Sequence, residues 1–134
     1  MKYIKDKAFP NERALYGEKD VTLDNCRFEG EEDGESALKE TKNVIILNSF
    51  IDLRYPLWHV EKLYMENVTQ TENCRASLWY SSNIRIHKCS LLGIKALTTC
   101  FTTGILYTFS CQGCSLFEEP ACTPPLSFNF LVIM

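Results

Sequence analysis

Short stretches of this chain alternate apolar and polar residues, and a leucine precedes each stretch at a fixed distance. The leucines, each behind a small residue or a proline, are Leu15, Leu38, Leu57, Leu78 and Leu97. Six and eight residues after the first four come the apolar pairs Val21 and Leu23, Val44 and Ile46, Leu63 and Met65, and Ile84 and Ile86. The first four leucines are 23, 19 and 21 residues apart. A repeat of this length is typical of a solenoid, in which every repeat forms one coil.

The alternation at period two predicts one short β-strand in each repeat. The connections are short and show no helical period. Stacked in register, the strands direct two columns of apolar side chains into the coil, and the leucines form a third wall. Burying one aliphatic side chain stabilises a fold by about 1.5–3 kcal/mol, so several coils together offset the entropy lost in ordering them. We therefore predict an all-β fold, a right-handed parallel β-helix of about four to five coils, the hand following the general preference of parallel crossovers.

Polar residues mark two corners in each coil. Asn25, Asn48 and Asn67 follow the apolar pairs, and Lys88 interrupts the series in the fourth repeat. Asparagine tolerates the left-handed conformation that such a corner requires, and stacked asparagine amides can bond to one another between coils. A second turn, before each strand, is predicted at Asp20, Asn43, Lys62 and Asn83.

A leucine-rich-repeat horseshoe is the nearest alternative fold, because its coils also place an asparagine after an L-x-L pair. In this chain one residue, and not two, separates the second apolar residue from the asparagine. The leucine also lies six residues before the strand, where the horseshoe has about three. Both spacings favour the β-helix.

The repeats divide the chain into two parts. Residues 1–97 carry the repeats, with an N-terminal cap over about residues 1–12, and residues 98–134 form a non-repeat tail. All 14 Lys and Arg and 15 of the 17 acidic residues lie in the first 96 positions, whereas the tail holds four of the seven cysteines. Two interpretations of the tail stay open. It is either a frameshifted or otherwise aberrant end of a longer reading frame, which makes the chain truncated, or a divergent C-terminal cap. In either case it folds over the open end of the last coil or stays disordered.

Composition and charge exclude several classes of protein. A net charge of −3 without a cluster of Lys and Arg argues against nucleic-acid binding. No apolar run approaches the roughly 20 residues of a membrane span, and the first residues lack the apolar core of a secretory signal. We therefore expect a cytoplasmic protein without a membrane partner. Unpaired strand edges at the open end of the last coil predict self-association.

The seven cysteines form no disulfide framework, because their number is odd and their spacing uneven. Cys26 and Cys89 share one repeat position with small residues of the other coils, which is typical of packed thiols. The CxxC pair at 111–114 has no second CxxC and no histidine near it. The acidic run at 29–35 lacks the alternating ligand order of a calcium loop, so a solvated turn is predicted there. We expect no metal and no cofactor.

Five short phrases carry a family resemblance. They are ERALYG, GESALKE, RYPLWH, RASLWYS and GIKAL, at residues 12–17, 34–40, 54–59, 75–81 and 93–97. With them the chain closely resembles the bacterial domain-of-unknown-function family 3737 over about residues 1–97. That family is similar to the pectin-lyase-like right-handed β-helices. The resemblance implies this fold and a bacterial origin, but no activity, because none is assigned to the family.

Pectin-lyase-like enzymes act through grouped carboxylates, together with an Arg or His on one outer face. The repeat places Glu66, Arg85 and His87 on one face of neighbouring coils. One carboxylate beside one His and one Arg is too few for that chemistry, and surface salt bridges explain these residues better. We assign no catalytic residue.

Aromatic residues are the better candidates for binding. Tyr16, Trp58 and Trp79 each follow a repeat leucine, and His59 and Tyr80 come one residue later. If the two indoles point outward, they lie about one strand spacing, roughly 5 Å, apart and form a flat strip suited to stacking on a sugar or a partner protein. If they point inward, they belong to the core. Core or family-defining packing is the favoured interpretation, but the direction stays open.

Two functions are compatible with this pattern. The first is a non-catalytic β-helix solenoid that binds a glycan or another protein along an exposed face, with the five ring-bearing residues as its site. The second is a carbohydrate-active enzyme, a polysaccharide lyase or hydrolase, whose site lies in coils missing from this chain. Fold alone does not choose between them. The missing acid pair favours the first.

Overall fold

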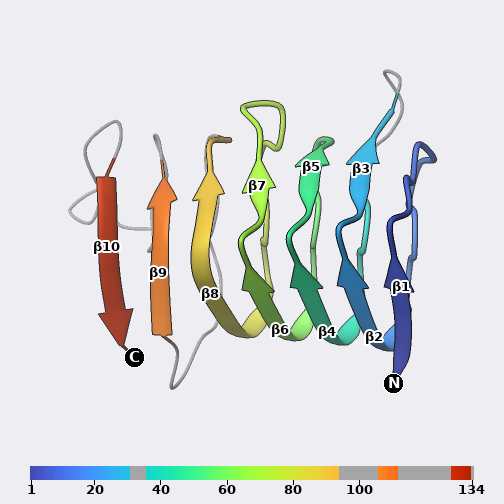
Figure 1. Ribbon diagram of the computed structural model, residues 1–134, viewed down its shortest axis with the longest axis horizontal. Helices are drawn as coiled ribbons and strands as arrows, with labels where there is room; N and C mark the ends of the chain where they lie inside the picture. Colours follow the sequence, from blue (N-terminus) through green and yellow to red (C-terminus); the bar gives the residue numbers. More distant parts are fainter. Residues whose placement is uncertain (31–35, 94–105, 112–127, 134) are drawn as a thin grey trace.

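The computed structural model describes residues 1–30, 36–93, 106–111 and 128–133, the last two ranges as backbone alone. These residues contain ten β-strands and no helix. The strands are β1 (Lys2–Lys5), β2 (Lys19–Asp24), β3 (Arg27–Glu29), β4 (Lys42–Leu47), β5 (Phe50–Asp52), β6 (Glu61–Glu66), β7 (Thr69–Gln70), β8 (Ser82–Leu91), β9 (Leu106–Cys111) and β10 (Phe128–Ile133). Figure 1 shows β1 at one end and β10 at the other, with β3, β5 and β7 above β2, β4 and β6 between them.

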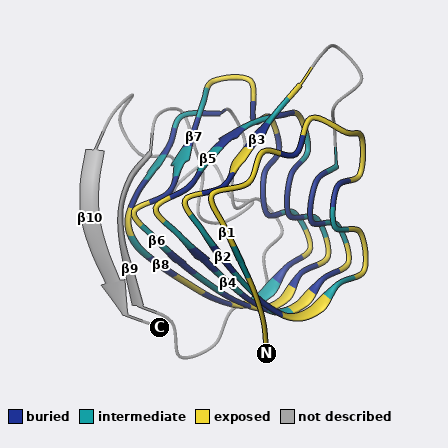
Figure 2. Ribbon diagram, turned by 45° about the vertical axis from the view of Figure 1, so that its right-hand side comes forward, coloured by how far each residue is buried: buried dark blue, intermediate teal, exposed yellow. Residues whose placement is uncertain are grey.

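Four coils follow one another along the chain, and each has three sides. Side A consists of β2, β4, β6 and the first half of β8, which pair in parallel. Side B consists of β3, β5, β7 and the second half of β8, again in parallel. Side C consists of the turns that carry the repeat leucines, at 13–17, 36–40, 55–59 and 76–80. The predicted parallel β-solenoid is confirmed, and Figure 2 shows its coils one behind another around a shared interior.

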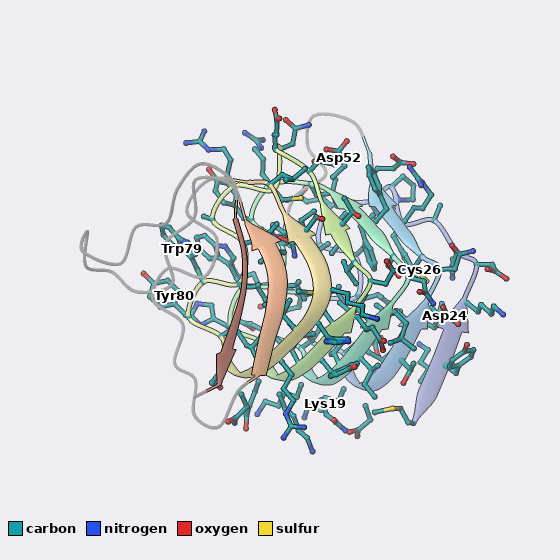
Figure 3. The ribbon with its side chains drawn as sticks, turned by 60° about the vertical axis from the view of Figure 1, so that its left-hand side comes forward. Lys19, Asp24, Cys26, Asp52, Trp79 and Tyr80 are labelled. Atoms are coloured by element: carbon teal, nitrogen blue, oxygen red, sulfur yellow. The ribbon has the colours of Figure 1, made fainter. Side chains whose placement is uncertain are left out.

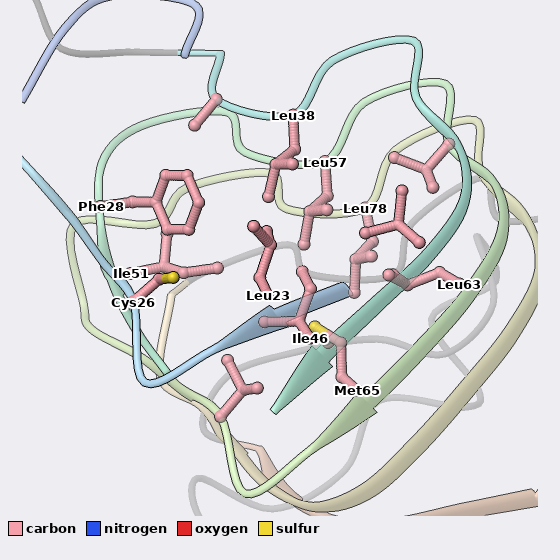
Figure 4. Close-up of a cluster of buried hydrophobic side chains, with 14 of the residues drawn as sticks. Leu23, Cys26, Phe28, Leu38, Ile46, Ile51, Leu57, Leu63, Met65 and Leu78 are labelled. Carbon is pink, nitrogen blue, oxygen red and sulfur yellow. The ribbon is translucent and has the colours of Figure 1, made fainter. Parts of the chain in front are cut away.

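The interior is lined from all three sides. On side A the eight apolar residues named above pair in register, and each is at most 2% exposed. On side B the inward column is Phe28, Ile51, Gln70 and Leu91. Leu38, Leu57 and Leu78 point into the same space from side C (Figure 4). The core is therefore one continuous column, as the spacing predicts.

Side C has a backbone that the hydrophobic pattern does not reveal. Every second residue is left-handed, for example Ser36, Leu38 and Glu40 with φ of 60°, 60° and 58°. Their N–H groups bond to the neighbouring coils: Leu38 N donates to Ala14 O at 2.8 Å, and Ser36 N to Arg54 O at 2.9 Å. These bonds and the burial of the leucines hold bulky residues in a conformation that they rarely adopt.

The polar corners have the predicted conformation. Asn25, Asn48 and Asn67 are left-handed, with φ of 54°, 50° and 55°. Asn67 Nδ2 donates to Asn48 Oδ1 at 2.8 Å, which confirms an amide contact between coils. Asn48 Nδ2 donates instead to Asp24 Oδ1 at 3.0 Å, so the ladder continues onto a carboxylate. The residues of the second turn, Asp20, Asn43, Lys62 and Asn83, are left-handed as well.

Replacing Lys88 by Asn is expected to raise the free energy of unfolding by about 1 kcal/mol. Lys88 has φ of 52°, which asparagine tolerates better, and an amide at this position continues the ladder from Asn67. Urea unfolding followed by tryptophan fluorescence measures the change. Lys88→Gln is the control, because glutamine has an amide but no left-handed preference. A Lys88→Asn variant no more stable than Lys88→Gln would contradict the ladder.

Small polar side chains beside the asparagine corner also join the coils. Ser49 Oγ accepts from Cys26 N at 3.1 Å and donates to Leu47 O at 2.7 Å. Cys89 Sγ makes the same pair of contacts two coils further on, accepting from Val68 N at 3.4 Å and donating to His87 O at 3.3 Å. Cys26, Cys74 and Cys89 are free and buried, which confirms the packed thiols.

The thiols of Cys74 and Cys89 are expected to resist iodoacetamide at pH 8 in the folded chain. Burial raises the pKa of each from its ordinary value of 9.0 to about 11, and the thiolate is the reactive form. Because the unfolded thiols ionise first, the folded state loses stability as the pH rises from 9.0 to about 11. Peptide mapping by mass spectrometry, with and without guanidinium, checks this. Alkylation of Cys89 without denaturant would contradict it.

Strands also lie beyond the four coils. At the N-terminal end β1 pairs in parallel with β2, and Phe9 stacks on Phe28 with ring centroids 4.8 Å apart, so the predicted cap region lies against the first coil. At the other end β9 pairs in parallel with β8, and β10 pairs antiparallel with β9. The rest of the predicted tail, at 98–105, 112–127 and 134, lies outside the described residues.

Candidate functional site: an aromatic cluster on side C

Five ring-bearing side chains, which we call the aromatic cluster, meet on side C of the third and fourth coils: Tyr55, Trp58, His59, Trp79 and Tyr80. Trp58 and Trp79 occupy the same position of neighbouring coils and stack, with ring centroids 5.4 Å apart and planes 10° apart. His59 and Tyr80 stack in the same way, at 5.1 Å and 15°. The backbone sets this pairing, because His59 N donates to Trp79 O at 3.0 Å.

The two stacks stand almost at right angles to each other. Tyr80 meets Trp58 at 78° and Trp79 at 88°, with centroids 6.2 and 6.1 Å away. Tyr55 approaches Trp58 edge-on, at 5.4 Å and 66°. Offset and edge-to-face contacts of this kind each contribute about 0.5–1.5 kcal/mol beyond simple burial. The aromatic cluster therefore ties the third coil to the fourth.

The indoles are neither core residues nor a flat strip. Trp58 and Trp79 are half-buried and lie outside the buried core, and Trp58 Nε1 donates to Ala76 O at 2.6 Å. The expectation that they belong to the core is therefore wrong for both. Parallel indoles with centroids 5.4 Å apart are too close to lie side by side in one plane, so their faces overlap. The strip expected for outward-pointing rings is instead a stack.

Tyr80 is more exposed than Tyr55 and the two tryptophans of the cluster. It is 44% exposed, and its stacking partner His59 is also exposed. Figure 3 shows Trp79 and Tyr80 together, at the opposite edge of the view from Asp24. Lys39 Nζ lies 5.8 Å from the ring centroid of Trp58, close enough for a cation–π contact. The surface thus combines the exposed ring of Tyr80 with the ammonium group of Lys39 and the imidazole of His59.

Tyr16 is separate from the aromatic cluster, although the repeat predicts it there. It lies on side C of the first coil and makes no ring contact within the described residues. Its side chain is 49% exposed, and its hydroxyl donates to Glu40 Oε2 at 2.5 Å. That hydrogen bond raises the pKa of Tyr16. The structure therefore brings together four of the five predicted binding residues.

Glu66, Arg85 and His87 share the outer face of side A, as the repeat predicts. Glu66 pairs in register with His87, and Tyr64 with Arg85. Tyr64 Oη donates to Glu66 Oε2 at 3.1 Å. The pKa of Tyr64 is raised, mainly by burial and secondly by this hydrogen bond. The ion pairs of the described residues do not include Glu66, Arg85 or His87, so the predicted salt bridges are wrong.

The described residues contain no group of three or more His, Cys, Asp or Glu side chains placed to hold a metal. The side chains of the CxxC pair and of residues 31–35 lie outside this description. Within the same residues no helix has the length and apolar character needed to cross a membrane.

Two buried polar side chains, Gln70 and Ser77, escaped the sequence analysis. Both are fully buried, and the side-chain polar atoms of both lack a hydrogen-bond partner within the described residues. Gln70 is a polar residue in an otherwise apolar column, which could have identified it. The column can be recognised only once the register of side B is known.

A family model described as "Protein of unknown function (DUF3737)" matches residues 2–106. The chain belongs to this family. The match covers the four coils of the DUF3737 solenoid, including the aromatic cluster, and ends at the first residue of β9. No curated protein and no solved structure gives a significant match to the chain.

Proposed function

We propose that this DUF3737 chain is a non-catalytic solenoid that binds a glycan through the aromatic cluster. The exposed ring of Tyr80, held by contacts with His59, Trp58 and Trp79, carries the proposal. The apolar C–H face of a sugar packs against an aromatic ring, and a ring already fixed by its neighbours loses little entropy on binding. Such a surface binds without reacting.

A glycan suits this surface better than a protein does. A stable protein interface buries about 800 Å² on each partner around a well-packed apolar centre. The large exposed apolar side chains described on side C are Tyr16 and Tyr80, which are too few for such a centre. Charged and polar groups, among them Lys39, Glu40 and His59, surround them and suit a ligand that carries many hydroxyls.

Tryptophan fluorescence tests the proposal directly, because the two tryptophans of the chain, Trp58 and Trp79, both lie in the aromatic cluster. Hexasaccharides of glucose, xylose and galacturonate are titrated onto the full chain. We expect at least one of them to change the emission saturably, and Tyr80→Ala to weaken that binding at least tenfold (about 1.4 kcal/mol or more).

Tyr3→Ala is the matched control. Tyr3 is 58% exposed and donates to Asp24 on side A, away from the aromatic cluster, so its loss should leave the affinity unchanged. Equal affinities of the unmodified chain and Tyr80→Ala would show that the cluster is not the site. No response to glycans in any of the three titrations counts against glycan binding.

A carbohydrate-active enzyme is the second candidate. The register pairs Glu66–His87 and Tyr64–Arg85 favour it, because they gather an acid, an imidazole and a guanidinium on side A. In this proposal the chain is a bacterial cytoplasmic relative of the pectin-lyase-like right-handed β-helices, and the side A group contributes to a site whose other groups lie in coils missing from this chain. Release of products from a polyuronate by a protein that has those coils, weakened in Glu66→Gln, would support it. Undiminished release by Glu66→Gln would exclude a role for this group.

A further inference from the structure

The inward column of side B changes character in the third coil. Gln70 lies in register between Ile51 and Leu91, and Phe28 completes the column in the first coil. Gln70 is fully buried, yet neither Oε1 nor Nε2 has a hydrogen-bond partner within the described residues. A buried amide without a hydrogen-bond partner lowers the stability of the fold by about 1–3 kcal/mol, and buried polar groups in native proteins rarely lack a partner.

Ser77 breaks a second apolar column close by. It precedes Leu78 on side C, where the other coils have Ala14, Ala37 and Pro56. Ser77 is also fully buried, and its Oγ has no hydrogen-bond partner within the described residues. Each of these two columns is thus apolar elsewhere in the described coils and polar at a single position.

The two polar positions lie on walls that meet at one corner. Gln70 ends side B of the third coil, and Ser77 begins side C of the fourth after the turn at 71–75. The equivalent pairs one and two coils earlier are Ile51 with Pro56 and Phe28 with Ala37. In Figure 4 Phe28 and Ile51 point into the interior shared with the side C leucines. Gln70 and Ser77 therefore lie on the two walls that adjoin this corner.

Two polar side chains in the turn are already engaged. Thr71 Oγ1 donates to Asp52 Oδ1, and Cys74 Sγ donates to Ile51 O at 3.0 Å, so neither serves the Gln70 amide. A direct bond between Gln70 and the Ser77 hydroxyl would pair only one of the two amide atoms. A partner that both donates and accepts satisfies all three groups at once.

We propose that Gln70 and Ser77 bind one internal water molecule at this corner. Water donates to Gln70 Oε1, accepts from Gln70 Nε2, and exchanges a further hydrogen bond with Ser77 Oγ. Three protein partners are the usual number for a buried water. The apolar pairs of the first two coils have no such requirement, which places the site at the junction of the third and fourth coils.

Nuclear magnetic resonance of the ¹⁵N-labelled full chain tests the site. The glutamines of the chain are Gln70 and Gln112. The side-chain amide signal that disappears in Gln70→Leu is therefore the signal of Gln70 in the spectrum of the unmodified chain. We expect the Gln70 amide protons to show a nuclear Overhauser effect to water of the sign given by a long-lived bound molecule. No cross-peak between the Gln70 amide and water in the folded, unmodified chain would overturn the proposal.

A double-mutant cycle supplies an independent readout. For Gln70→Leu and Ser77→Ala, we expect the unfolding equilibrium constant of the double variant to differ about tenfold from the product of the single effects. The reason is that each single change leaves the other polar group without its water. Ser49→Ala is the control partner, since its hydroxyl bonds to Cys26 and Leu47 at another corner, and it should combine with Gln70→Leu within about twofold.

Independent effects of Gln70→Leu and Ser77→Ala would overturn the shared water. If one of the variants does not fold, the cross-peak in the unmodified chain decides the question alone.

Discussion

Replacing Phe28 by Ala is expected to lower the free energy of unfolding by about 3–5 kcal/mol. Phe28 is fully buried on side B and stacks on Phe9, so the change removes a large apolar surface and leaves a cavity. The walls cannot close around that cavity, because β3 is bonded in register to β5 and the interior is packed from all three sides. Urea unfolding followed by tryptophan fluorescence measures the loss.

Phe50→Ala is the matched control for this prediction. Phe50 lies on the neighbouring strand of side B, but it points outward, half-exposed, with the Arg27 guanidinium 4.3 Å from its ring centroid. Its loss should cost about 1 kcal/mol or less, the value of an exposed cation–π contact. Similar losses for Phe28→Ala and Phe50→Ala would contradict the inward and outward alternation of side B.

Gly93→Ala is expected to cost about 2–3 kcal/mol through a steric clash. Gly93 follows β8 at the end of side B, and a Cβ there would lie 2.1 Å from Cys74 O. The obstacle is backbone and not the flexible end of a side chain, so the turn that carries Cys74 must move. The loss appears as a lower midpoint in urea and a lower melting temperature by circular dichroism.

Gly17→Ala separates this clash from the cost of losing glycine itself. Gly17 has φ of +70° and nothing within 4 Å of an added Cβ, so alanine there meets conformational strain alone. We expect a loss of about 1 kcal/mol. A Gly93→Ala variant as stable as Gly17→Ala would show that the backbone around Cys74 yields without cost.

The coils were predictable because two local rules agree over four repeats. Period-two alternation at Val21 and Leu23, repeated at the same distance from each leucine, leaves only one register that buries every apolar residue. The asparagine corners were predictable for a similar reason, since few residues adopt positive φ without cost. Lys88 shows the limit of that rule, because it is left-handed despite its side chain.

The aromatic cluster was only partly predictable. Equal positions in the repeat put Trp58 beside Trp79 and His59 beside Tyr80. The same reasoning included Tyr16, but the second coil has Lys39 at that position, so the aromatic column is interrupted. The direction of the rings depends on the alternating left-handed backbone of side C, and no periodicity rule for strands or helices describes such a backbone.

The sequence by itself determined the number of residues in each coil, the inward columns of side A and the asparagine corners, because these depend on spacing and local conformational preference. Only the tertiary structure decided how side C winds, how the rings stack, and that the buried polar atoms of Gln70 and Ser77 have no hydrogen-bond partner within the described residues. The physical reason is that these features arise between walls of the solenoid. Hydrogen bonds and packing between coils override the preferences of single residues there.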